Sequence, residues 1–176
     1  MGDYFVFTAI GTDRVGIVDE IAAVLEAENC NIEESRMAVL GTEFSVMLLA
    51  SGGQGIVQIL EKDLPDIGDK LGLHVQIRPT RAPRGSSEGR PYSIEAISLD
   101  APGIMHAVTA VLKRAGANIE EISTETTSAP WTGATMFQMR GTLIVSREVH
   151  IAELRDQLEN LEHERDIDIV LKPLNR

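Results

Sequence analysis

Two short turns contain the residues best suited to binding a ligand. Residues 11–17 have the sequence GTDRVGI and residues 98–104 have SLDAPGI, so a carboxylate stands three residues before a glycine in each. A helix that begins there presents unpaired backbone N–H groups, which attract an anion such as a ligand carboxylate. Asp13 or Asp100 can meet an ammonium group. Each turn therefore predicts a binding site for a zwitterion, and we call each of these two turns a corner. The alternative is that the aspartate caps the N-terminus of the helix and the glycine only forms a tight turn.

The other reactive side chains show no pattern typical of catalysis or of a metal site. Cys30, the only cysteine, has no histidine near it in the sequence, which argues against a nucleophile. The four histidines show no HxxxH or HExxH spacing. Glu33-Glu34 and Glu120-Glu121 are adjacent pairs, and neighbours on a strand point to opposite faces, so neither pair predicts two-carboxylate catalysis. We expect no enzyme activity, no metal and no cofactor.

The two turns lie in two copies of one sequence. Residues 12–36 return as residues 99–123, with the same Asp, the same Gly-Ile, an Ala-Val-Leu segment and Asn-Ile-Glu-Glu at matching positions. A repeat of this length predicts two copies of a small domain rather than a solenoid. The stretch 81–91, RAPRGSSEGRP, has no apolar pattern. We therefore expect one domain at residues 1–80, a linker at 81–91 and a second domain at 92–176.

Each copy is expected to contain the elements βαββαβ. An alternating strand precedes each turn, an amphipathic helix follows it, and a hairpin, a second helix and a closing strand complete the copy. This order predicts an α+β fold of two tandem ferredoxin-like domains, each with two helices on one face of a four-stranded antiparallel sheet. The apolar positions that define these elements are Phe5, Phe7, Ala9, Ile17, Ile21, Val24, Leu25, Phe44, Val46, Leu48, Ile56, Ile59, Leu60, Leu64 and Ile67, then Tyr92, Ile94, Ala96, Ile104, Val108, Val111, Leu112, Ile151, Leu154, Leu158 and Leu161.

Composition limits the partners of the chain. Its 176 residues include 27 acidic and 16 basic side chains, a net charge of −11, and only 4% aromatic residues. Nucleic-acid affinity needs clustered positive charge, and RNA-binding sheets of this topology need aromatic side chains, so we expect no direct nucleic-acid contact. The N-terminus lacks the pattern of a signal peptide, and no apolar run is long enough to span a bilayer. With a single cysteine, this favours a cytoplasmic protein without membrane contact.

The longest specific motif is NIEESRMAVLGTEFSVMLLASG, residues 31–52, which follows the turn DRVGI. It resembles the tandem ACT-domain regulators of the glycine cleavage system, a family in the ACT-domain superfamily. The resemblance extends over the whole chain, including the second turn DAPGI and the second NIEE. ACT domains are ferredoxin-like regulatory modules that commonly bind amino acids at the seam between paired domains.

The resemblance implies a function and a set of contacts. It implies a small amino-acid effector, with glycine favoured, and control of transcription through a protein partner such as a LysR-type activator. Free sheet edges and faces favour a homodimer. The alternatives are a freestanding ACT protein that regulates a metabolic enzyme, or a structural dimer without ligand. The resemblance assigns the ligand contacts to the turn and to the start of the second strand, here Asp13, Arg14, Val15, Gly16 and Asn31, and Asp100, Ala101, Pro102, Gly103 and Asn118.

The two copies differ at two places. The first turn has Val15 where the second keeps Pro102, which should soften the first loop, and Arg14 adds a cation that could engage a carboxylate or a neighbouring acid. The second hairpin is longer by about six residues at Thr124–Thr135 and carries the only tryptophan, Trp131. A large aromatic on a Pro/Gly loop indicates an interaction surface or a lid, and packing onto the sheet is the alternative.

Overall fold

The computed structural model describes residues 2–82 and 89–174. The chain divides into two compact units, Met1–Arg84 and Gly85–Arg176, and each is described by itself. Residues 83–88 of the expected linker lie outside the described residues, and its last two residues, Arg90 and Pro91, already belong to a strand. The domain boundaries proposed from the sequence therefore stay a prediction.

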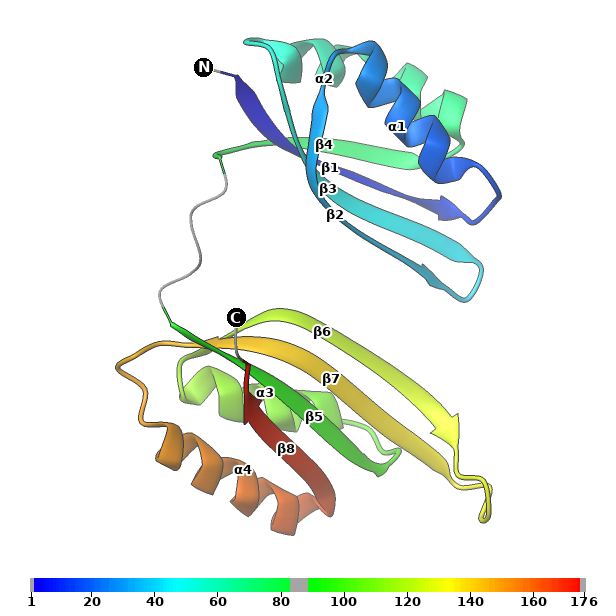
Figure 1. Ribbon diagram of the computed structural model, residues 1–176. Helices are drawn as coiled ribbons and strands as arrows, with labels where there is room; N and C mark the ends of the chain where they lie inside the picture. Colours follow the sequence, from blue (N-terminus) through cyan, green and yellow to red (C-terminus); the bar gives the residue numbers. More distant parts are fainter. Residues whose placement is uncertain (1, 83–88, 175–176) are drawn as a thin grey trace. The chain divides into compact units, whose positions relative to one another are not determined.

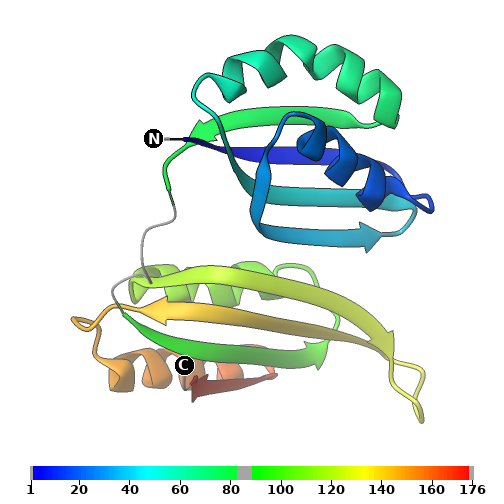
Figure 2. The same ribbon diagram turned by 45° about the horizontal axis from the view of Figure 1, so that its top comes forward.

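The first unit contains the expected βαββαβ order. Its strands form one antiparallel sheet in the order β2-β3-β1-β4, so β1 lies in the interior and pairs with β3 and β4. Both helices lie on one face of this sheet (Figures 1 and 2). The elements are β1 (Asp3–Thr12), α1 (Ile17–Ala27), β2 (Asn31–Leu40), β3 (Glu43–Gly52), α2 (Ile56–Leu71) and β4 (His74–Thr80).

The second unit repeats this topology. Its sheet has the order β6-β7-β5-β8, again antiparallel, with both helices on one face (Figure 1). The elements are β5 (Arg90–Leu99), α3 (Ile104–Arg114), β6 (Ala117–Ser128), β7 (Thr135–Val145), α4 (Ile151–Arg165) and β8 (Ile167–Pro173). The predicted fold class of two tandem ferredoxin-like units is confirmed.

The buried residues of each sheet follow the alternation of side chains along its strands. Phe5 and Phe7 on β1 are fully buried against the helices, because alternate residues of a strand face the same side. One helical position was predicted wrongly: Ile59 is 48% exposed, whereas Val57 is buried. Successive helical residues turn by about 100°, and the buried face of α2 runs from Ile56 towards Val57, which leaves Ile59 beyond its edge.

Candidate functional site

Each predicted corner is a turn between a sheet strand and a helix that begins after a glycine. Gly16 and Gly103 precede α1 and α3 with the same φ of 90°, a left-handed conformation that favours glycine. The backbone N–H of Asp13 donates to the Thr42 carbonyl at 2.9 Å, and that of Asp100 donates to the Thr135 carbonyl at 2.9 Å. Each corner is therefore fixed to the turn end of its hairpin.

The expected alternative, an aspartate that caps the helix, is wrong in both units. The N-cap position is the glycine itself, and no side chain makes a capping hydrogen bond to α1 or α3. Among the described residues, the carboxylates of Asp13 and Asp100 have no hydrogen-bond or ion-pair partner. Each corner thus places a free carboxylate near a helix start whose first N–H groups have no intrahelical acceptor.

Arg14 makes the first corner rigid. Its NH1 and NH2 groups donate to Oε1 and Oε2 of Glu20, both at 2.6 Å, and NH2 also donates to the Leu71 carbonyl at 3.1 Å. The hydrogen bond from Arg14 holds the pKa of the Glu20 carboxyl below its usual value. Arg14 therefore engages a neighbouring acid, one of its two expected roles. It ties the turn to α1 and to the end of α2, and so compensates for the missing proline.

The second corner has neither partner of this ion pair. Ala101 and Ala107 stand at the positions of Arg14 and Glu20, so the turn depends on Pro102 for its rigidity. One further polar group lies just before it: the hydroxyl of Ser98 is buried and has no hydrogen-bond partner among the described residues. The two corners share a backbone shape and an aspartate, but they differ in chemistry.

A surface cavity of about 360 Å³ lies beside the first corner. The corner supplies its polar side through Asp13 and Arg14, while the rest of its wall is apolar. Helix α1 supplies Ile17 and Val18, β2 supplies Met37 to Val39, and β3 supplies Phe44. The sequence interpretation did not single out these residues as a ligand wall. The available signal was the apolar run Met37–Leu40, whose strand is almost entirely exposed.

Asn31 does not lie at this corner. On β3, Glu43 pairs with Thr12 beside the corner, whereas Ser51 pairs with Asn31. At about 3.3 Å per residue, these eight positions along β3 place Asn31 about 26 Å from the corner. The Asn31 amide donates to Oε1 of Glu33 at 3.1 Å. Within one unit, therefore, the two predicted parts of the ligand site are at opposite ends of the sheet.

The same holds in the second unit, because the pairing is repeated. Asn118 pairs with Ile144 near one end of β7, whereas Leu99, next to the corner, pairs with Met136 near the other end. One unit alone therefore brings the turn residues together but leaves out the asparagine.

The duplicated acidic pairs lie on β-bulges. The pairing of β2 with β3 shifts between Ile32 and Glu34, and the pairing of β6 with β7 shifts between Ile119 and Glu121. The simple alternation used in the sequence interpretation is therefore interrupted at these pairs. In the first copy, Glu33 accepts hydrogen bonds from Ser51 at 2.6 Å and from Asn31, which lower its pKa.

Glu34, the other member of the first pair, forms an exposed ion pair with Arg36 at 3.0 Å. The two carboxylates are thus held by different partners, Glu33 by Ser51 and Asn31 and Glu34 by a cation. This is a structural arrangement of the strand edge and not a pair poised for acid–base chemistry.

Trp131 lies on the loop between β6 and β7, which extends past the end of its sheet (Figure 2). Its side chain is 97% exposed. The alternative that it packs onto its own sheet is therefore wrong. A large aromatic side chain held in water on a hairpin tip fits an interaction surface.

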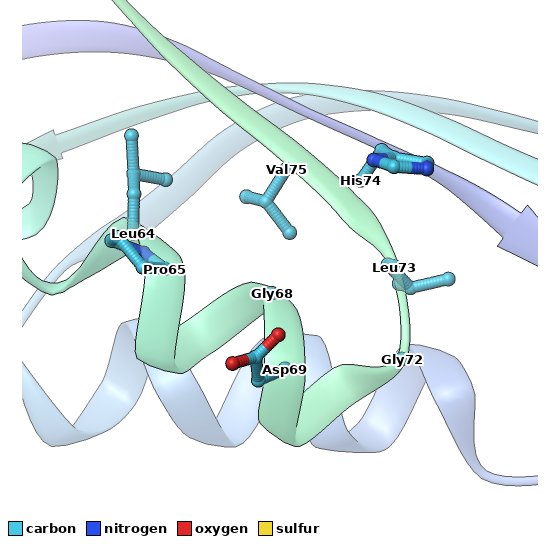
Figure 3. A pocket seen from close by; sticks show the side chains of 8 residues that line it. All are labelled: Leu64, Pro65, Gly68, Asp69, Gly72, Leu73, His74 and Val75. Carbon is cyan, nitrogen blue, oxygen red and sulfur yellow. The ribbon is translucent and has the colours of Figure 1, made fainter.

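A second cavity of the first unit, of about 520 Å³, lies between α2 and the start of β4 (Figure 3). Val75 points towards the helix, whereas His74 is turned away from it. Gly68 leaves room here, since a Cβ at this position would approach the Leu73 carbonyl oxygen to 3.1 Å. No predicted site residue lines this cavity, and Asp69 and His74 are its only ionisable wall residues.

In the ranges 2–82 and 89–174, no three His, Cys, Asp or Glu side chains gather as metal ligands would. None of the helices in that part of the chain combines the length and the apolar character needed to cross a bilayer.

Comparison with known sequences identifies relatives. Residues 3–78 match the family model of the ACT domain. The glycine cleavage system transcriptional repressor of Escherichia coli (strain K12) is 35% identical over 127 residues, which are 72% of this chain and 66% of that protein. The chain thus spans just under two thirds of the length of this curated relative.

Comparison with solved structures covers both units. A crystal structure of an unknown protein from Galdieria sulphuraria has 35% sequence identity and a TM-score of 0.81, and the match covers 99% of this chain and 100% of the other. A structure provisionally named as a glycine cleavage system transcriptional repressor has 23% identity and a TM-score of 0.76, with 100% and 99% covered. The second likeness shows the fold alone.

Proposed function

The chain belongs to the ACT-domain family, and from that premise we propose that it senses a small amino acid and regulates a protein partner. It acts in the cytoplasm, has no catalytic role, and works as a homodimer. The resemblance to a glycine cleavage system transcriptional repressor makes control of transcription the favoured output and glycine the first ligand to test. Because the chain is strongly acidic, it reaches DNA through a partner such as a LysR-type activator.

The observation that carries this proposal is the free carboxylate of Asp13 at the glycine-capped start of α1, beside a cavity. An amino acid carries an ammonium group and a carboxylate on one carbon. Asp13 is suited to the ammonium group. The Ile17 N–H already donates to the Arg14 carbonyl at 3.4 Å, so the next N–H groups in the first turn of α1 are suited to the carboxylate. Glu20 and the Leu71 carbonyl, which accept hydrogen bonds from Arg14, hold the turn in this shape in the absence of ligand.

The proposal also sets a requirement for Asn31. Because Asn31 and the corner are at opposite ends of one sheet, they can touch a single small ligand only when they come from two different ACT units. The position of the ligand at a seam, and the role of Asn118, stay predictions. Regulation would then follow from population shift: ligand stabilises one arrangement of units, and the partner binds that arrangement better.

Calorimetric titration and thermal unfolding of the full chain test the proposal. At a ligand concentration of 100 Kd, one site adds about 2.7 kcal/mol, which raises the Tm of a unit of this size by about 10 °C or more. Asp13→Asn should abolish the response if the first corner is the site, and Asp100→Asn if the second is. Asp66→Asn, an exposed carboxylate on α2, is the control. A response that survives both corner variants would contradict the proposal.

A pull-down with the full chain tests the partner. A DNA-binding regulator among the captured proteins supports the transcriptional output, whereas a biosynthetic enzyme supports the alternative in which the chain regulates metabolism. Trp131→Ala should weaken the captured complex, because an exposed tryptophan on a loop tip is the kind of residue that anchors an interface.

A further inference from the structure

We propose that the effector bound at the first corner has an aliphatic side chain of about the size of leucine or methionine, and that glycine is not its preferred ligand. This inference rests on the proposed function, because it names the ligand class of the same corner. It departs from the expectation that the sequence resemblance gives.

The wall of the cavity is apolar and partly exposed. Met37 and Val39 on β2 are 50% and 51% exposed, and Val18 on α1 is exposed as well. These three side chains line one cavity, together with the buried Ile17 and Phe44. An apolar ligand group placed there would remove apolar surface of both molecules from water. Glycine has no side chain and would leave these apolar side chains exposed to water.

The volume of the cavity also favours a ligand with a side chain. This open cavity measures about 360 Å³, far more than the share of one water molecule in the liquid, about 30 Å³. Glycine would fill the polar end and leave most of the volume to solvent. An aliphatic amino acid fills more of it and contacts both α1 and β2.

The charged groups of the cavity wall belong to the corner. The polar groups gather at one side of the cavity, where Asp13 and Gly16 form the corner. Arg14 already donates to both carboxylate oxygens of Glu20, so a second acid would have to displace Glu20 to pair with it. This leaves one free carboxylate and one helix start at the polar end and an apolar wall at the other. The arrangement complements a zwitterion with an aliphatic tail, because the charged wall residues lie at the corner and the wall formed by α1, β2 and β3 is apolar.

The test compares ligands and two matched methionine variants. Met37 pairs with the buried Val46 and so faces the helix side, whereas Met47 lies on the opposite face at a similar exposure of 55%. We would titrate the wild-type chain and the variants Met37→Asp and Met47→Asp with leucine, methionine and glycine. Val39→Asp serves as a second cavity variant, and far-ultraviolet circular dichroism checks that each variant folds.

The proposal expects leucine or methionine to bind at least about tenfold more tightly than glycine, the scale on which an apolar pocket discriminates side chains. Met37→Asp and Val39→Asp should remove this preference, and Met47→Asp should keep it. Equal or tighter binding of glycine, unchanged in Met37→Asp, would overturn the inference while the proposed function stands. No binding of any amino acid would overturn the proposed function and this inference with it.

Discussion

Replacement of Gly16 by alanine is a direct test of the corner geometry. Gly16 has a φ of +90°, and the nearest atom to an added Cβ would be Glu20 Oε1 at 3.9 Å, so no neighbouring residue obstructs an alanine. The effect therefore comes from the backbone. A left-handed conformation costs an L-residue about 1–2 kcal/mol. Alanine also reduces the entropy of the unfolded chain, which offsets about 0.4–1 kcal/mol of this cost. The free energy of unfolding should therefore fall by about 1 kcal/mol.

Differential scanning calorimetry of the full chain measures this loss. For a unit of this size, about 1 kcal/mol lowers the Tm by about 4–8 °C. Gly103→Ala should lower the Tm of the second unit by a similar amount, because Gly103 has the same φ and open space around it. Gly53→Ala is the matched control: it also has open space, but its φ lies outside the left-handed region, so the variant should be neutral or slightly stabilised. A Gly16→Ala variant as stable as Gly53→Ala would show that the left-handed backbone at Gly16 costs an alanine nothing.

Three further predictions concern charge, surface and core. The pKa of Glu20 is lowered from 4.5 by its hydrogen bond with Arg14, so the pair stabilises the fold at neutral pH and loses this effect as the pH falls through the folded-state pKa. Wild type and Glu20→Gln should therefore differ in Tm at pH 7 in low salt and converge as the pH falls through the lowered pKa of Glu20; a constant difference would contradict this. Trp131→Ala should leave the Tm unchanged, and Trp131 fluorescence should be readily quenched by acrylamide, whereas a protected indole would show that the loop is covered. Leu112→Ala should lower the free energy of unfolding, measured in urea, by about 2–5 kcal/mol because the side chain is fully buried, while Leu99→Ala, on an exposed side chain, should change it little.

Much of the fold could be predicted because local patterns decide it. The period of two in Phe5 and Phe7 and the helical spacing after Gly16 report which face of each element is buried. Because the sequence is duplicated, the order of elements in the second unit follows from that in the first. The helix ends also follow residue type: Asn29 and Gly116, just past α1 and α3, have φ values of 53° and 73°, a left-handed conformation that asparagine and glycine tolerate.

Other features depend on residues that are distant in sequence. The partner of Arg14 at the Leu71 carbonyl lies 57 positions away, and no local pattern predicts that contact. The bulge at Glu33 comes from the pairing of two strands, so the sequence of one strand suggested plain alternation. The cavity arises because Met37 and Val39 extend beside the start of α1, which depends on tertiary packing.

Nuclear magnetic resonance titration of the ¹⁵N-labelled full chain tests the central claim most directly, since it reports where an amino acid binds. With leucine, methionine or glycine, we expect the largest amide shifts at Gly16, Ile17 and Val18, and with leucine or methionine also at Met37 and Val39. We expect no such response in Asp13→Asn. Shifts confined to residues away from the first corner, or none with any amino acid, would contradict the claim that this corner is the sensing site.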